Sequence, residues 1–435
     1  MASISTSFYA SILLSSIFLH LFFQHDVAAS DLSIRPNRKS LEIVIGGGIF
    51  PSPPEYNPPP EPFYHPPPPP HVSPRVLLAY KVIQNFKRRI TCDPKGILKT
   101  WVGFDVCKYK GFLCGTHPVY KQTAVSGVVF NGFLFAGPEL TLDGFVDGLE
   151  DITIFHANSN NFTGKVPVGI NKLQYFYELD LSNNKLTGDF PMEVIGATQL
   201  TFLDLRYNSF SGKVPPQVFN LDVDVLFINN NDLEQPLPQN IGSTPALYLT
   251  FANNKFTGPI PKSIKQASKT LKEVLFLRNN LSGCLPYEIG YLKKAILFDA
   301  SHNQLTGPIP HSFACLSKME QLNFANNQLY GKIPESVCKL PSLDKLTLEN
   351  NYITDAGPEC RKLIEKKVLN VKKNCIRDLP NQRSEAECNA FLKKPKYCDN
   401  DHTLTYIPCE SKPYEQPIPP PASPPVTYGA LSPHP

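Results

Sequence analysis

The stretch 253–261 reads NNKFTGPIP, and close copies of it recur along the chain: NNKLTGDFP begins at residue 183, SHNQLTGPIP at 301 and NNQLYGKIP at 326. Aligned on Asn-x-(Leu/Phe)-x-Gly, the copies are separated by steps of 23 to 25 residues. Their asparagines are Asn160, Asn184, Asn208, Asn231, Asn254, Asn279, Asn303, Asn327 and Asn351. A degenerate tenth copy, VVFNGFLFAG, occupies residues 128–137. One short structural unit is therefore repeated about ten times.

Repeats of 20–29 residues built on L-x-x-L-x-L-x-x-N-x-L are leucine-rich repeats, and each is too small to bury its apolar face alone. In ELDLSNNKL, Leu179 and Leu181 alternate as in a short strand with one face directed inward. The sequence therefore predicts an α/β repeat solenoid, a leucine-rich repeat horseshoe or superhelix that occupies residues 128–359.

Each residue type that recurs in the repeated phrase has a structural explanation. An asparagine amide can satisfy backbone groups inside a tight turn, which would otherwise stay unpaired at a cost of roughly 1–3 kcal/mol each. Glycine permits unusual backbone dihedrals, and proline ends the turn with a fixed φ. We therefore do not interpret these ladder asparagines as catalytic.

The cysteines indicate the compartment. The chain has 11 of them, a number that normally pairs in an oxidising space, and the odd total leaves at least one without a partner in the chain. No Cys-x-x-Cys occurs, which argues against zinc. The net charge of +4 is too small to indicate nucleic-acid binding.

Both ends of the chain differ in composition from the repeats. Residues 1–29 contain the apolar run ILLSSIFLHLFF and then Val27-Ala28-Ala29, whose small residues suit signal peptidase, and are predicted to be a secretory signal peptide. The alternative is a retained membrane anchor, but polar residues interrupt the run. Residues 30–72 and 410–435 are proline-rich and are predicted to be extended, disordered arms without a core. We read IGGGIF at 45–50 as linker, because no helix follows it.

A solenoid needs caps at its exposed ends, and we assign these to residues 73–127 and 360–409. Ser73-Pro74 has the chemistry of a helix start, and Trp101 is expected to cover the first layer. The disulfide candidates are Cys107, Cys114, Cys315, Cys338, Cys360, Cys375, Cys388, Cys398 and Cys409. Cys107 and Cys114 can bridge locally. Cys338 has two alternative partners, Cys315 and Cys360, which the sequence does not separate.

Several motifs together resemble one family. LEIVIGGG, a proline-rich arm, WVGFDVCKYKGFLC, repeats ending in GPIP, LSGCLPYEIG, SVCKLPSL and VLNVKKNCIRDLPNQRSEAEC are similar to the leucine-rich repeat extensins of plant cell walls. The resemblance covers about residues 73–409 and implies a plant-type repeat domain that binds a small basic, cysteine-containing peptide of the rapid alkalinization type, with homodimers in the family. PPPASPPVTYGALSPHP lacks repeated Ser-Pro blocks, so the chain resembles a short-tailed form.

The candidate ligand-binding surface is the concave face, formed by outward strand positions. Carboxylates combined with unshielded phenylalanines suit a peptide groove with apolar anchors and charge selection; the alternative is an ordinary solvated face. The candidate residues are His156, Asp180, Asp204, Arg206, Phe227, Asn229, Thr250, Phe276, Arg278, Asp299 and Asn323.

The sequence also contains evidence on functions other than peptide binding. No Gly-x-Ser-x-Gly, His-Glu-x-x-His or P-loop motif occurs, so we expect neither an enzyme nor a cofactor. Residues 361–397 hold 11 Lys or Arg against 4 Asp or Glu, which suggests a pectin contact at Lys393, Lys394 and Lys396. Inhibition of a wall-degrading enzyme is a third alternative. Asn161-Phe-Thr and Asn280-Leu-Ser are candidate glycosylation sites.

Overall fold

A computed structural model describes residues 71–394, 398 and 404–409. The expected signal peptide at 1–29, nearly all of the expected arm at 30–72, the tail at 410–435 and Lys396 lie outside these residues.

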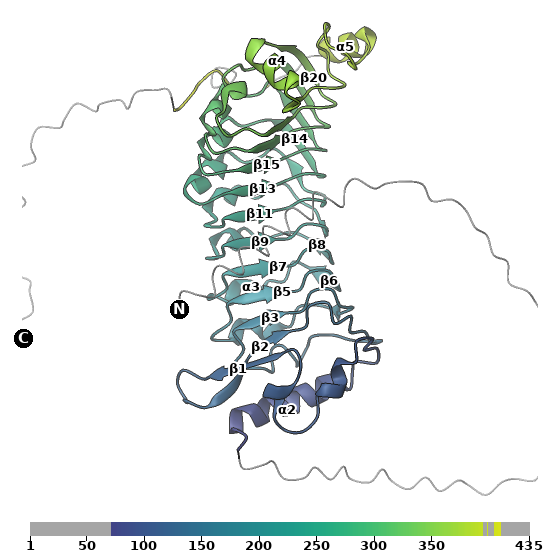
Figure 1. The fold of residues 1–435 in the computed structure, drawn as a ribbon, viewed down its shortest axis with the longest axis vertical. Coiled ribbons are helices and arrows are strands. Elements are labelled where there is room, and N and C mark those ends of the chain that lie inside the picture. The colour runs from purple at the N-terminus through teal and green to yellow at the C-terminus, as the bar shows by residue number, and fades with distance from the viewer. Residues whose placement is uncertain (1–70, 395–397, 399–403, 410–435) are drawn as a thin grey trace, which may run out of the picture. The chain divides into compact units, whose positions relative to one another are not determined.

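The predicted repeat solenoid is confirmed. Its main feature is a sheet of 12 strands, in which β1 pairs antiparallel with β2 and all later neighbours pair in parallel (Figure 1). The strands of this sheet are β1 Phe112–Thr116, β2 Thr123–Val129, β3 Ile154–His156, β5 Glu178–Asp180, β7 Phe202–Asp204, β9 Val225–Phe227, β11 Tyr248–Thr250, β13 Glu273–Leu275, β15 Leu297–Asp299, β17 Gln321–Asn323, β19 Lys345–Thr347 and β21 Leu369–Asn370.

Each repeat continues from its main strand through a second short strand and a helical turn. The second strands form sheets of four and five strands: β4 Thr163–Gly164, β6 Lys185–Asp189, β8 Ser209–Gly212 and β10 Asp232–Leu233, then β12 Thr257–Gly258, β14 Asn280–Cys284, β16 Gln304–Gly307, β18 Gln328–Ile333 and β20 Tyr352–Ala356. The helical turns are α3 Glu193–Gly196 and the 3₁₀ helices η4 Val168–Lys172, η5 Pro216–Asn220, η6 Ile241–Ser243, η7 Lys262–Lys269, η8 Tyr287–Tyr291, η9 His311–Cys315 and η10 Val337–Lys339.

The ladder asparagines hold successive turns together. Asn254 Nδ2 donates to the carbonyls of Phe251, 3.1 Å away in its own turn, and Ile228, 3.0 Å away in the preceding repeat. Its Oδ1 accepts from the backbone N–H of Leu233 at 3.1 Å. The Ile228 carbonyl also accepts from Asn231 at 3.1 Å, so one carbonyl serves two ladder asparagines. Hydrogen bonding inside the solenoid is therefore continuous from repeat to repeat.

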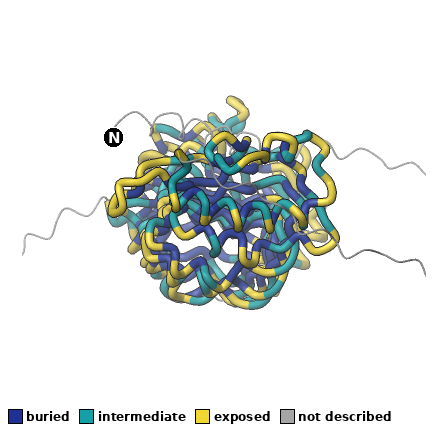
Figure 2. Tube along the Cα trace, turned by 90° about the horizontal axis from the view of Figure 1, so that it is seen from below, coloured by how far each residue is buried: buried dark blue, intermediate teal, exposed yellow. Residues whose placement is uncertain are grey.

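The repeated phrase also has the backbone geometry that its residues require. Asn253 has φ +51° and Gly258 has φ +71°, both in the left-handed region that asparagine and glycine tolerate best. Inside the turn, Leu179 and Leu181 are each 1 % exposed, as the alternation predicted. Viewed along the solenoid, buried residues fill the interior and exposed residues lie on the rim (Figure 2).

An aromatic cap closes the first repeat. Helix α2 Pro74–Lys87 begins at Ser73, whose side chain accepts from the Val76 N–H at 3.2 Å, and η2 Ile97–Thr100 and η3 Val106–Lys108 follow it. Trp101 is 1 % exposed, and its ring centroid lies 5.5 Å from that of Phe130 in the first repeat. Its Nε1 donates to the Lys110 carbonyl at 3.0 Å.

The C-terminal end differs from the expected boundary. β21 and Asn374 continue the array beyond residue 359, since Asn374 donates to the Leu348 carbonyl at 2.8 Å and accepts from the Ile353 N–H at 2.9 Å. Helices α4 Pro358–Glu365 and α5 Glu385–Leu392 complete this end. The cap is therefore built around one further repeat.

Five disulfides link parts of the chain, one in the N-terminal cap and four that involve residues between Cys284 and Cys409. The structure pairs Cys338 with Cys360 rather than Cys315, and Cys315 instead bonds Cys409. Cys284, which was not among the candidates, bonds Cys398 across a sequence separation of 114 residues. The other two pairs are Cys107–Cys114 and Cys375–Cys388. Cys92 is exposed and is the free cysteine of the described part of the chain.

Candidate functional site

The strand register arranges the outward side chains of the main sheet in rows that cross the repeats. Parallel pairing aligns equivalent residues of neighbouring strands, about 4.8 Å apart. The first row contains Ile154, Glu178, Phe202, Val225, Tyr248, Glu273, Leu297, Gln321 and Lys345. The second row contains His156, Asp180, Asp204, Phe227, Thr250, Leu275, Asp299, Asn323 and Thr347.

Most of the candidate residues lie together on this surface. The second row includes seven of them: His156, Asp180, Asp204, Phe227, Thr250, Asp299 and Asn323. Arg206 and Asn229 lie two residues further along their strands, on the same side. The resulting surface is continuous over eight strands from β3 to β17.

Two candidates do not belong to these rows. Phe276 is 0 % exposed and packs in the core, with its ring centroid 5.9 Å from that of Phe298. The prediction was wrong because Phe276 stands three residues before its ladder asparagine, Asn279, the same inward position that Leu181 occupies before Asn184. Arg278 lies at the turn beside Asn279, with φ +54°. The outward residues of that repeat are Glu273 and Leu275.

The first row was missed entirely. Its residues lie two positions before those of the second row, so the period of two in each strand was the available signal. This row contributes Glu178 and Glu273, and also the half-buried Phe202. Together with Phe227 in the second row, Phe202 supplies aromatic surface between two groups of carboxylates, one toward β5 and the other toward β15.

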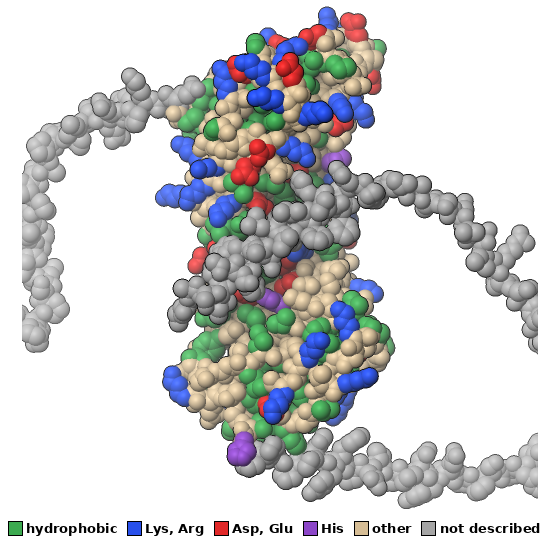
Figure 3. Space-filling model, viewed as in Figure 1, with side chains coloured by type: hydrophobic (Ala, Val, Ile, Leu, Met, Phe, Trp, Pro, Cys, Tyr) green, Lys and Arg blue, Asp and Glu red, His purple; other side chains and the backbone are tan. Residues whose placement is uncertain are grey.

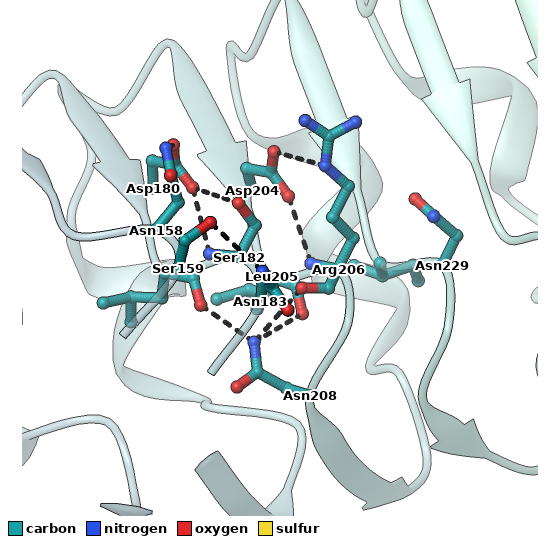
Figure 4. A network of polar contacts seen from close by, with 12 residues as sticks. Asn158, Ser159, Asp180, Ser182, Asn183, Asp204, Leu205, Arg206, Asn208 and Asn229 are labelled. Carbon is teal, nitrogen blue, oxygen red and sulfur yellow. Dashed lines mark hydrogen bonds and ion pairs between the residues drawn. The ribbon is translucent and has the colours of Figure 1, made fainter. Parts of the chain in front are cut away.

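Hydrogen bonds position the carboxylates of the second row (Figure 4). Asp180 Oδ1 accepts from the Ser182 N–H at 2.9 Å and from its hydroxyl at 2.7 Å, and Oδ2 accepts from Asn158 Nδ2 at 2.9 Å. Asp299 repeats part of this pattern with Ser301. Asp180 and Asp299 are both buried, and these hydrogen bonds hold their carboxylates in fixed positions.

Asp204 and Arg206 form an ion pair on this surface. Arg206 Nε lies 2.9 Å from Asp204 Oδ2, and the Arg206 guanidinium lies 5.1 Å from the centroid of the Phe227 ring. Burial raises the pKa of Asp204 to about 8; Asp180 acts in the same direction, while Arg206 opposes it. Burial favours the protonated form of Asp204, and a cation bound next to it would favour the ionised form instead.

Further charges flank the rows. His156 Nε2 lies 2.8 Å from Glu178 Oε2, which joins the first row to the second. Burial lowers the pKa of His302, at the turn beside Asn303, and the nearby Arg278 adds to this effect. At the C-terminal end, Lys393 and Lys394 are exposed just after α5.

The described residues contain no group of His, Cys, Asp or Glu side chains arranged to hold a metal ion. In the same part of the chain no helix is long and apolar enough to cross a membrane. Asn161 is half-buried and Asn280 is exposed at the start of β14, and both remain predicted glycosylation sites.

The comparisons with known proteins agree on the repeat architecture. The Leucine Rich Repeat family model matches residues 176–196, 199–221, 296–316 and 318–340. The chain is 49% identical over 330 residues to leucine-rich repeat extensin-like protein 6 of Arabidopsis thaliana, covering 75% of this chain and 68% of that protein. It is 47% identical to the extensin-like protein 1 of the same plant, again over 75% of this chain but only 44% of that longer protein.

Solved structures share the fold. The crystal structure of PEPR1-AtPEP1 superimposes with a TM-score of 0.57 at 25% identity and covers 68% of this chain and 44% of that one. A plant peptide hormone receptor, RGFR1 in complex with RGF2, gives a TM-score of 0.52 at 24% identity, over 57% of this chain and 40% of the receptor. A plant ice-binding protein gives 0.56 at 21% identity, over 71% and 98%. At these low identities the last two matches establish the fold alone.

Proposed function

Because the chain belongs to the leucine-rich repeat extensin-like family of plants, we propose that it is a secreted, non-enzymatic protein of the cell wall that binds a small basic signalling peptide on its concave rows. The observation that carries the proposal is the row arrangement, with aromatic side chains between two groups of carboxylates. The five disulfides fit an oxidising, extracellular compartment.

The chemistry of the rows favours a cationic ligand with apolar side chains. Glu178, Asp180, Asp204, Glu273 and Asp299 all belong to the two rows, whereas Arg206 is engaged with Asp204. Phe202 and Phe227 can receive apolar side chains in the middle of the surface. The fold itself is compatible with such a ligand, since RGFR1 has the same architecture and forms a complex with RGF2. A peptide of the rapid alkalinization type, basic and cysteine-containing, has the required character.

Replacing Phe227 by alanine is expected to weaken peptide binding by about 2 kcal/mol, or about 30-fold, because it removes a central aromatic contact. Combining it with Asp204→Lys should weaken binding by about 100-fold or more, since a cation then faces a cation. Isothermal titration calorimetry with a synthetic, oxidised peptide of the rapid alkalinization type measures both. Met192→Ala is the matched control, because Met192 is 53 % exposed at the start of α3, outside the rows. Unchanged affinity in the double variant would show that the rows are not the binding surface.

Peptide affinity should increase between about pH 5 and about pH 8. In the free protein the pKa of Asp204 is raised to about 8, so at lower pH a cationic ligand must displace its proton, and proton release makes binding pH-dependent. The ligand's lysines and arginines stay charged throughout this range. The same titrations on Asp204→Asn should show a much flatter pH profile, and equal slopes for the two proteins would contradict a cation contact at Asp204.

The ligand's identity is best tested with the intact protein. Affinity capture from plant wall extract, with the Phe227→Ala, Asp204→Lys variant as the parallel bait, should recover a small basic peptide on the wild type alone. Recovery of a wall-degrading enzyme instead, equally on both baits, would favour the inhibitor alternative.

A further inference from the structure

A line of exposed lysines runs along the side of the solenoid on which the chain enters the main strands. These turns connect each 3₁₀ helix, or α4, to the strand that follows. From η7 onward every such turn has at least one lysine at its start or within it. We call this set the lysine ladder: Lys269, Lys293, Lys294, Lys318, Lys339, Lys366 and Lys367.

The ladder is confined to one part of one flank. In the N-terminal half Lys172, at the end of η4, is the one lysine in an equivalent position. The turns at 173–177, 197–201, 221–224 and 244–247 themselves contain no Lys or Arg, and the third of them has two aspartates. Figure 1 shows β6 and β8, which follow the main strands, on the right, so the turns that precede the strands lie on the left. Figure 3 shows Lys and Arg side chains gathered along the left edge of the upper half, where the C-terminal repeats lie.

The seven lysines are not neutralised by neighbours. All are exposed, and none forms an ion pair with a residue of the described ranges, in contrast to Lys255 with Asp232 or Lys362 with Glu359. The nearby carboxylates are Glu320, Asp344 and Glu365 in the same turns, and Glu359, whose pKa is lowered mainly by Lys362 and also by Lys339. Four carboxylates against seven lysines leave positive charge in excess. A surface with this excess of unpaired positive charge attracts anions over a distance of several ångströms.

The geometry of the ladder indicates the shape of its partner. Neighbouring strands are about 4.8 Å apart, so the five strands from β13 to β21 spread the lysines over about 19 Å. A small anion would need several donors that converge on one point, whereas this line presents one or two cations per step. All seven residues are lysine rather than arginine, which suits point-charge attraction more than the two-pronged recognition of phosphate or sulfate.

We propose that the lysine ladder binds an unbranched acidic polysaccharide, a polyuronate with one carboxylate on each sugar. A linear chain of this kind lying along the flank meets successive lysines without bending. The choice of carboxylates rests on the proposed function, since a protein of the cell wall is surrounded by acidic polysaccharides. The concave rows stay free, so the protein can hold a polysaccharide and a peptide at the same time.

The test compares three charge-reversal variants of the full chain for binding to de-esterified polygalacturonate. The ladder variant is Lys293→Glu, Lys294→Glu and Lys318→Glu. The matched control is Lys165→Glu, Lys185→Glu and Lys213→Glu, three exposed lysines on the opposite flank of the N-terminal half, with the same change in net charge. The cap variant is Lys393→Glu with Lys394→Glu.

At about 0.1 M salt the ladder variant should bind about tenfold more weakly than the wild type, whereas the control should change by less than about twofold. Fully methyl-esterified polymer, which has no carboxylates, should not bind, and affinity for oligomers should rise with length until they span the ladder. A ladder variant that loses no more affinity than the control would overturn the proposal, as would loss confined to the cap variant. Peptide affinity of the ladder variant should remain that of the wild type, so failure here is distinguishable from failure of the concave site.

Discussion

Replacing Asn254 by leucine is expected to lower the free energy of unfolding by about 2–4 kcal/mol. Leucine has nearly the shape of asparagine but cannot accept from the buried Leu233 N–H, which is then left without its partner. The carbonyls of Ile228 and Phe251 lose one of their two asparagine donors. Urea unfolding followed by circular dichroism measures the change.

The adjacent residue supplies the control. Asn253 precedes Asn254 in the same stretch, and no hydrogen bond of its side chain occurs within the described residues. Asn253→Gly keeps the left-handed backbone, φ +51°, so it should cost less than about 1 kcal/mol. If both substitutions destabilise the protein equally, the ladder is not what distinguishes the two asparagines.

Removal of the Cys338–Cys360 disulfide, by replacing both cysteines with alanine, should cost about 3 kcal/mol of unfolding free energy. The bond closes a loop with a sequence separation of 22 residues and joins η10 to α4, and both sulfurs are buried. The bond lowers the conformational entropy of the unfolded chain. Because both cysteines belong to the array, this effect stabilises the array as a whole. Denaturant unfolding under non-reducing conditions gives the value.

The comparison that tests this explanation is the Cys284–Cys398 pair. Loop length alone would assign it the larger effect, about 4.7 kcal/mol. Cys398 lies outside the repeats, however, so its release should free that segment without unfolding the array. We therefore expect Cys284→Ala with Cys398→Ala to lower the midpoint less than Cys338→Ala with Cys360→Ala does. The reverse order would show that residues near 398 are part of the same cooperative unit.

The repeated phrase was sufficient to predict the solenoid, because its period, its inward leucines and its turn residues all depend on local sequence. Asn374 was missed although it follows Asn351 by 23 residues, a step that fits the period, because the sequence after residue 359 was assigned to a cysteine-rich cap. Phe276 was assigned to the concave face, although its position three residues before Asn279 is the one at which Leu181 points inward in its own repeat. Disulfide partners such as Cys284 and Cys398 could not be predicted, since their proximity depends on how a distant segment returns to the array.

The carbonyls that accept from two asparagines have a consequence for recognition. They fasten every repeat to its neighbour through the same atoms, so the rise from one strand to the next is set before any ligand arrives. A partner that spans several repeats therefore meets a surface whose spacing is already established, and little conformational entropy is lost when it docks. Affinity should then depend mainly on how well the partner's own charges and side chains match that fixed spacing.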